Sequence, residues 1–155
     1  MPLIPEQHRQ KAGWVAICVT CVAGFEGLRT AAYADPIGIP TICFGETKGV
    51  TLGQRASVDQ CKGMLADSLA IADQGVSSCV RTYLPDERRA AFVSMTYNIG
   101  VGNFCSSSLV RKVNVGDVRG ACDEMLRWNR AGGVVLPGLT KRRAAEREMC
   151  LKGIE

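Results

Sequence analysis

The stretch that decides the fold, residues 12–53, reads AGWVAICVTCVAGFEGLRTAAYADPIGIPTICFGETKGVTLG. Residues 12–28 are apolar on almost every face of a helix, so we expect a first helix that is mostly buried. In residues 29–53, glycines and prolines separate short β-prone pieces such as 39–44. This texture is typical of a small hairpin or a three-stranded sheet with tight turns. The stretch therefore predicts a buried helix that leads into a small β lobe.

The rest of the chain is predicted to be helical. Ser57 and Gln60 have the spacing of a capping box, which begins a helix that ends near residue 74. Pro85 suits the first turn of the next helix, and Gly100 suits its end. Shorter helices are expected at residues 104–114, 117–129 and 139–151. Several helices after one β-prone segment indicate an α+β fold that is predominantly helical.

A single domain is expected over residues 12–155, after a polar leader at residues 1–11. The chain has 155 residues, which is long enough to bury a core, and no Pro/Ser-rich linker divides it. Within this domain, the small antiparallel β lobe would span residues 29–56. The helical lobe would comprise residues 57–155 together with the first helix, residues 12–28.

The composition excludes several classes of protein. Hydrophobic residues make up 46% of the chain and charged residues 22%, which is too apolar for a disordered protein. The longest uncharged run, residues 12–25, falls short of the roughly twenty residues of a spanning helix, so no permanent membrane anchor is expected. The net charge of +4 is modest. A nucleic-acid binder is disfavoured because basic and aromatic residues are not interleaved.

The eight cysteines are the unusual feature of the composition. They have no evident task in a reducing cytosol, whereas an oxidising compartment would use them as disulfides. Spacing alone does not give their connectivity. A metal site is disfavoured because Cys18-x-x-Cys21 is the only CxxC pair and the single histidine, His8, lies in a polar segment. We therefore expect disulfides, no metal and no cofactor.

Two carboxyl groups near the junction of helix and β lobe are candidate catalytic groups. Glu26 ends the apolar helix, where its protonated form is favoured, whereas Asp35 lies in a polar loop and would stay ionised. A glycoside hydrolase needs such a pair: one group donates a proton and the other acts on water or on the anomeric carbon. The Thr41 hydroxyl would help to hold the water. Two simpler interpretations stay open from the residues alone: Glu26 pairs with Arg29, and Asp35 bonds the backbone of its own turn.

The densest basic cluster is Lys141-Arg142-Arg143, which is followed by Glu146 and Arg147. An i,i+4 pair from Arg142 to Glu146 is typical of a solvated helix face. We favour that interpretation for most of the cluster.

Three segments around the candidate carboxyls carry a Glu, an Asp and a Thr at set intervals: Phe25–Arg29, Tyr33–Asp35 and Thr41–Gly45. This pattern resembles the active-site signature of phage-type lysozymes, the endolysins of the T4-lysozyme family (glycoside hydrolase family 24). The chain is particularly similar to the cysteine-containing endolysins of lambdoid phages. The similarity continues in order to about residue 152, through Arg89-Ala90, Tyr97–Gly100, Gly102–Phe104, Leu109–Lys112 and Gly138–Glu146.

The resemblance implies a lysozyme-like fold of two lobes and a muramidase, which hydrolyses the β-1,4 bond between N-acetylmuramic acid and N-acetylglucosamine in peptidoglycan. By this likeness, Glu26 is the general acid, and Asp35 and Thr41 position and activate the attacking water with inversion. An inverting pair of carboxyls stands about 6.5–9.5 Å apart. Relatives that run the alternative lyase reaction generally lack the Asp and Thr, so the chain favours hydrolysis.

Further roles also follow from the resemblance. Arg142 or Arg143 of the last helix would pair with Glu26. Tyr97 and Asn98 would lie in the substrate cleft, although a core aromatic and a helix C-cap explain these two residues equally well. Glu46 stands where many relatives carry His, which would change a local ion pair or the charge of the cleft.

Relatives with cysteines suggest three disulfides: Cys43 with Cys61, Cys79 with Cys105, and Cys122 with Cys150. Cys18 and Cys21 would then remain within the apolar first helix as small buried residues.

The expected partner is the glycan strand of peptidoglycan, bound by a monomer that is made in the cytoplasm of the host bacterium and acts in the periplasm. A cleaved signal peptide is disfavoured because cleavage near Gly24 would remove the helix that covers Glu26. Two routes of export stay open: the first helix serves as an uncleaved, transient signal anchor, or a holin releases the protein. The alternative function is a catalytically silent peptidoglycan-binding module of the same fold.

Overall fold

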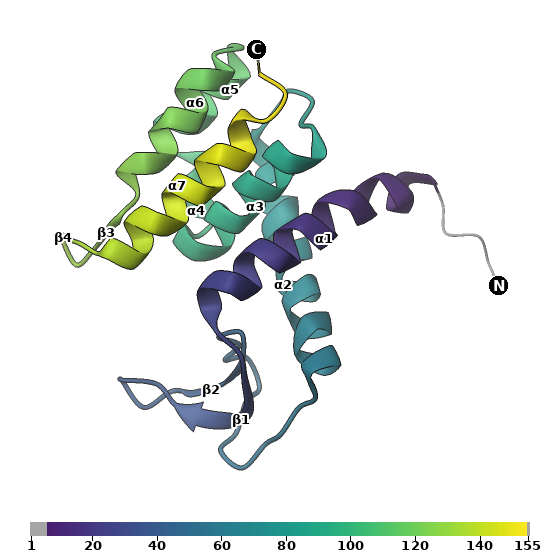
Figure 1. Cartoon of the computed structure of the whole chain (residues 1–155), viewed down its shortest axis with the longest axis vertical. Helices are drawn as coiled ribbons and strands as arrows, with labels where there is room; N and C mark the ends of the chain where they lie inside the picture. Colours follow the sequence, from purple (N-terminus) through teal and green to yellow (C-terminus); the bar gives the residue numbers. More distant parts are fainter. Residues whose placement is uncertain (1–5, 155) are drawn as a thin grey trace.

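The computed structural model describes residues 6–154, with side chains from residue 13 onward (Figure 1). Its first helix, α1, spans Glu6–Glu26. The polar leader that was expected at residues 1–11 therefore ends earlier: residues 6–11 are good helix formers and continue α1 backwards, whereas residues 1–5 lie outside the described part. In residues 6–154, no helix is long and apolar enough to span a bilayer.

Helix α1 buries one stripe rather than its whole surface. Trp14, Cys18 and Val22, spaced four residues apart, are buried, whereas Ala16 and Thr20 on the other side are exposed. The expectation of a mostly buried helix is thus too broad. An apolar sequence does not tell which faces a neighbour will cover, and here α1 packs on one side only, against α2 (Val58–Cys79) and α3 (Asp86–Ile99).

The β lobe is a hairpin of β1 (Arg29–Ala34) and β2 (Pro40–Cys43). The strands are antiparallel, and Tyr33 lies opposite Thr41. The sequence left a hairpin and a three-stranded sheet open, and the structure has the two-stranded hairpin. Isolated bridges between Ala31 and Arg55 and between Ile42 and Glu46 extend it. Figure 1 shows this lobe below the helices, where α1 enters it and α2 leaves it.

The capping box that begins α2 is confirmed. Ser57 Oγ accepts a hydrogen bond from the Gln60 backbone N–H at 3.1 Å, and Gln60 Oε1 accepts one from the Ser57 backbone N–H at 2.8 Å. The helix runs five residues beyond the expected end, to Cys79. Gly100 ends α3 as expected.

The rest of the helical lobe is made of short elements around α3. They are α4 (Val101–Cys105), α5 (Ser108–Asn114), α6 (Val118–Glu124), a 3-10 turn η1 (Met125–Arg127), strands β3 (Arg130–Ala131) and β4 (Val134–Val135), and α7 (Pro137–Leu151). The helix expected at residues 117–129 is shorter, and a small hairpin follows it. Gly132 and Gly133 form the turn of that hairpin with φ values of 58° and 79°, which glycine adopts without strain.

Helix α3 is the centre of the core, since it packs against α1, α2 and α7 (Figure 1). Phe92 of α3 is fully buried and its ring lies 5.6 Å from that of Phe104 of α4. The fold is therefore α+β and predominantly helical, as expected, and α3 lies between the helix that ends in Glu26 and the helix that carries Arg142.

Three disulfides join the elements, and they are the pairs that the resemblance implied. Cys43–Cys61 links β2 to α2, Cys79–Cys105 links α2 to α4, and Cys122–Cys150 links α6 to α7. The thiols of α1 remain free: Cys18 is buried and Cys21 is half-buried. The disulfides thus hold both the β lobe and α7 to the rest of the fold.

Candidate active site

Glu26 is the last residue of α1, and its carboxyl lies between the last helix and the loop after β2. Gly27 follows with a φ of 69°, which ends the helix. Arg142 Nη1 of α7 donates to Glu26 Oε1 at 2.6 Å. On the other side, a Cβ on Gly45 would lie 3.7 Å from Glu26 Oε2. The side chain keeps 25% of its surface exposed, so it is held by protein on two sides and remains open to a ligand.

The two candidate arginines are now distinguished. Arg142, and not Arg143, forms the ion pair with Glu26. The simpler interpretation, a pair with Arg29, is wrong: the guanidinium of Arg29 lies 5.0 Å from the ring centroid of Tyr33. The Arg142 guanidinium also lies 5.2 Å from the Phe25 ring centroid. Arg142 therefore contacts both Glu26 and the residue that precedes it in the sequence.

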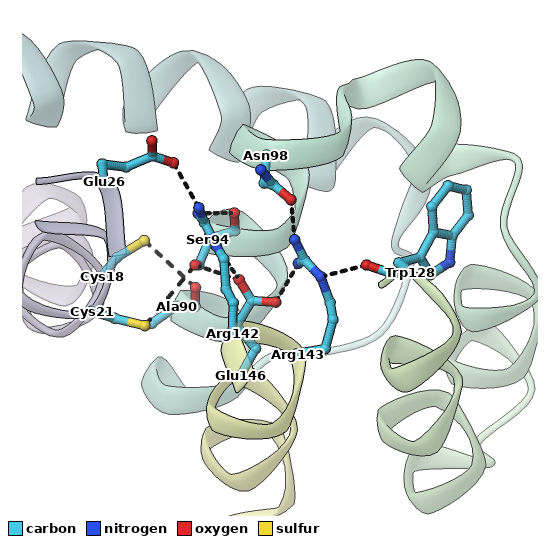
Figure 2. A network of polar contacts seen from close by, with 10 residues as sticks. All are labelled: Cys18, Cys21, Glu26, Ala90, Ser94, Asn98, Trp128, Arg142, Arg143 and Glu146. Carbon is cyan, nitrogen blue, oxygen red and sulfur yellow. Dashed lines mark hydrogen bonds and ion pairs between the residues drawn. The ribbon is translucent and has the colours of Figure 1, made fainter. Parts of the chain in front are cut away.

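Four charged side chains form a continuous chain of contacts, which we call the ion cluster: Glu26, Arg142, Glu146 and Arg143 (Figure 2). Arg142 Nε donates to Glu146 Oε1 at 3.1 Å, and Arg143 Nη1 donates to Glu146 Oε2. Glu146 and Arg143 are fully buried and Arg142 is nearly so. A solvated helix face was expected for these residues. That expectation is wrong because this side of α7 packs on α3.

Uncharged groups complete the hydrogen bonding of the ion cluster. Ser94 Oγ of α3 donates to Glu146 Oε1 at 2.7 Å, and the Ser94 carbonyl accepts from Arg142 Nη2 at 3.2 Å. Arg143 Nε donates to the Trp128 carbonyl at 3.0 Å. Buried charges are costly unless they are paired and hydrogen-bonded, and here each guanidinium nitrogen has an acceptor.

The two arginines differ in their electrostatic surroundings. Burial lowers the pKa of Arg143, although Glu146 opposes this. For Arg142, burial acts in the same direction, but the hydrogen bonds and charges of Glu26 and Glu146 outweigh it and raise its pKa. The difference arises because Arg142 contacts two carboxylates and Arg143 only one.

Asp35 and Thr41 both bond the backbone of one residue of the β hairpin, Ile39. Asp35 Oδ1 accepts hydrogen bonds from the backbone N–H groups of Ile37 at 2.9 Å and Ile39 at 2.8 Å. The Thr41 hydroxyl donates to the Ile39 carbonyl at 2.9 Å. Asp35 thus bonds its own turn, as the simpler interpretation expected, but it does so through one oxygen. Within the described residues, Oδ2 makes no hydrogen bond and is available to a ligand or a water molecule.

Tyr97 and Asn98 lie at the end of α3, near both lobes. Tyr97 is half-buried and its hydroxyl is 3.5 Å from the Phe44 carbonyl, to which it donates. Burial raises the pKa of Tyr97, and the charges of Glu46 and Glu26 add to this. Asn98 is exposed, lies inside the last turn of α3 rather than at its C-cap, and accepts a hydrogen bond from Arg143 through Oδ1.

Glu46 joins the β lobe to α2. The Ser68 hydroxyl lies 3.0 Å from both carboxylate oxygens of Glu46. Burial raises the pKa of Glu46, the hydrogen bond from Ser68 lowers it, and the charges of Asp67 and Glu26 raise it further. Glu46 therefore places a carboxyl in a contact between the β lobe and α2.

The role of Glu146 was missed by sequence reasoning, although one signal could have shown it. Arg142, Glu146 and Cys150 are spaced four residues apart and share one stripe of α7. Because Cys150 is buried in a disulfide, the whole stripe faces the interior. Nothing in the sequence marks Ser94, whose contribution depends on how α3 meets α7.

Comparison with known proteins places this geometry in a family. The sequence model described as Phage lysozyme matches residues 23–146. The chain belongs to the phage lysozyme family. That family consists of glycoside hydrolases that act on peptidoglycan.

Individual members of the phage lysozyme family and solved structures agree with this assignment. The SAR-endolysin of Enterobacteria phage P21 is 41% identical over 131 residues, which are 84% of this chain and 79% of that protein. The muramidase domain of SpmX from Asticaccaulis excentricus superposes with a TM-score of 0.81 and 32% identity, over 87% of this chain and 95% of that domain. A mutant of P22 lysozyme gives a TM-score of 0.80 and 31% identity, over 88% and 96% of the two chains.

Proposed function

We propose that the protein hydrolyses the β-1,4 bond between N-acetylmuramic acid and N-acetylglucosamine, with Glu26 as the general acid. The observation that carries this proposal is the position of the Glu26 carboxyl. Arg142 holds one oxygen, and the side chain keeps 25% of its surface exposed. A fixed and partly exposed carboxyl can deliver a proton to the glycosidic oxygen as the bond breaks.

Asp35 and Thr41 would activate and orient the attacking water. Because Asp35 Oδ1 is occupied by its own turn, Oδ2 is the atom that accepts a proton from water. The Thr41 hydroxyl gives its hydrogen to the Ile39 carbonyl, so its lone pairs accept the second hydrogen of the water. The oxygen lone pair of the water is then free to attack the anomeric carbon from the side opposite the leaving group, which inverts the configuration.

The substrate would lie between the lobes. Tyr97 bridges α3 and the β lobe, and Asn98 is exposed beside it with Oδ1 held by Arg143. The Asn98 amide nitrogen is therefore directed by the ion cluster and would donate to a sugar or an N-acetyl oxygen. No step needs a metal or a cofactor.

Mass analysis of the products tests the reaction. Purified sacculi digested with the protein should release muropeptides with a reducing end, which are one water heavier than the anhydro products of a lyase. Proton NMR of early products should show the inverted anomer first. Anhydro products would contradict hydrolysis, and the absence of soluble products would favour the silent wall-binding module.

We further propose that residues 12–155 act as one domain and as a monomer in the periplasm, after synthesis in the cytoplasm of the host. The three disulfides support an oxidising compartment as the place where the protein acts. The P21 relative is named a SAR-endolysin, and proteins of this kind are exported to the periplasm. Secretion from cells without a holin would test the route of export. Non-reducing mass analysis of the intact chain would test the three disulfides.

A further inference from the structure

We propose that Glu146 is a positioning residue, which fixes Arg142 against Glu26 and balances the charge of the ion cluster around that carboxyl. The inference rests on the proposed role of Glu26 as general acid. Glu146 does not contact the cleft, since it is fully buried, so it would act only through the arginines.

Glu146 fixes the orientation of Arg142 through hydrogen bonds. Glu146 uses Oε1 for Arg142 and Ser94, and Oε2 for Arg143. Arg142 in turn is held at all three nitrogens, by Glu26, Glu146 and the Ser94 carbonyl. A planar guanidinium with three fixed acceptors has one orientation. Without Glu146, Nε loses its acceptor and the guanidinium can turn away from Glu26.

Glu146 also balances the charge of the two arginines. The ion cluster contains two guanidiniums and two carboxylates, so it is neutral as a whole. Burial raises the pKa of Glu146, whereas both guanidiniums oppose this. We take Glu146 as ionised, because two buried cations with Glu26 as their only anion would leave one of them uncompensated. The negative charge of Glu146 therefore offsets Arg143, and Glu26 is left facing the single positive charge of Arg142.

The other groups that face Glu146 do not supply a charge. From α1, Cys21 and Cys18 lie close enough for Glu146 to affect them, but burial raises the pKa of both thiols and keeps them neutral. From α3, the facing group is the Ser94 hydroxyl. On this side of Glu26, the net charge therefore depends on the balance between Glu146 and the two arginines.

Glu146 also reaches the proposed substrate contact. The guanidinium that it holds through Oε2 donates to Asn98 Oδ1 (Figure 2). One buried carboxylate thus orients both the partner of the general acid and an exposed amide of the cleft. Loss of Glu146 should therefore raise KM as well as lower kcat.

The test is the pH dependence of kcat/KM in the intact chain, measured on soluble peptidoglycan fragments. In a plot of kcat/KM against pH, the fall on the alkaline side (the alkaline limb) reports loss of the proton from the general acid. Glu146→Gln removes a negative charge, so the limb should move to lower pH by about one unit, with a roughly tenfold loss above it. Arg143→Gln removes a positive charge, so the limb should move to higher pH. The double variant restores the balance, and its limb should return close to that of wild type.

A merely structural role predicts a different result. All three variants would then lose stability and activity while their limbs stay in place, and the double variant would be the weakest; that outcome would overturn the proposal. If Glu146→Gln does not fold, the other two variants still test the proposal, because it predicts a limb at higher pH for Arg143→Gln and a limb close to that of wild type for the double variant. Glu148→Gln, an exposed carboxyl on the same helix, is the matched control and should leave the profile unchanged. Hydrolysis of the same fragments by wild type separates a failure of this inference from a failure of the proposed function.

Discussion

Arg142 of α7 donates to the carboxylate of Glu26 at 2.6 Å, although 116 residues of chain separate them. The last helix of the fold therefore determines the surroundings of a group at the end of the first. The disulfide between Cys122 and Cys150 holds α7 to α6, and α7 packs on α3, so the contact belongs to the tertiary structure as a whole. Changes at Arg142 should thus affect catalysis, although this residue lies on the last helix of the fold.

Replacement of Arg142 by lysine should lower kcat/KM about tenfold and also lower the melting temperature. Lysine keeps the charge but cannot bond Glu26, Glu146 and the Ser94 carbonyl in one plane. Steady-state kinetics and thermal unfolding measure the two effects. Arg147→Lys, on the same helix at the ion pair with Asp123, is the control and should change little. Wild-type kinetics for Arg142→Lys would contradict the role of Arg142.

Replacement of Asp35 by asparagine separates chemistry from folding. The amide oxygen can still accept from the N–H groups of Ile37 and Ile39, so the melting temperature should stay within a few degrees of wild type. The other atom becomes an NH₂ group, which cannot take a proton from water, and kcat should fall by about 10²–10⁴. Asp35→Ala should lose both the turn and the activity. Retained activity in Asp35→Asn would show that Asp35 serves only the turn.

Replacement of Glu46 by glutamine should stabilise the protein at neutral pH. The pKa of Glu46 is raised in the folded state, chiefly by burial, so the folded state binds a proton more tightly than the unfolded state. Stability is therefore lost as pH rises from the ordinary glutamate pKa through the raised value. The neutral amide avoids this loss and can still accept from Ser68.

The gain for Glu46→Gln should be a few degrees at most in melting temperature at pH 7 and should vanish near pH 4. Thermal unfolding across that range measures it, with Glu148→Gln as an exposed control. A gain that is equal at both pH values would mean that the effect does not come from the titration of Glu46.

Removal of the disulfide between α6 and α7 should cost about 3–4 kcal/mol in the free energy of unfolding, from the entropy of the released loop. Its cysteines are 28 residues apart. The Cys122→Ala/Cys150→Ala variant should show this loss in urea unfolding, whereas Cys21→Ala, at a free and half-buried thiol, should show much less. A loss below about 1 kcal/mol would mean that α7 is held by packing alone.

The sequence was sufficient to predict the fold class, the capping box at Ser57 and the hairpin around Asp35, because these depend on local spacing. It did not predict the surroundings of Glu146. The spacing of Arg142 and Glu146 is the same on a solvated and on a buried helix face, and only the packing of α7 on α3 distinguishes them. Likewise, the composition of α1 did not show that one side of it would stay exposed.

The central claim is that Glu26 donates the proton that cleaves the glycan. The most direct measurement is the rate at which chloroform-treated Gram-negative cells lyse. It compares wild type, Glu26→Gln and the surface control Glu148→Gln, after thermal unfolding has shown that all three proteins are folded. We predict that wild type and Glu148→Gln lyse the cells at the same rate and that Glu26→Gln is slower by at least about 10³-fold. Lysis by Glu26→Gln at the wild-type rate would contradict the claim.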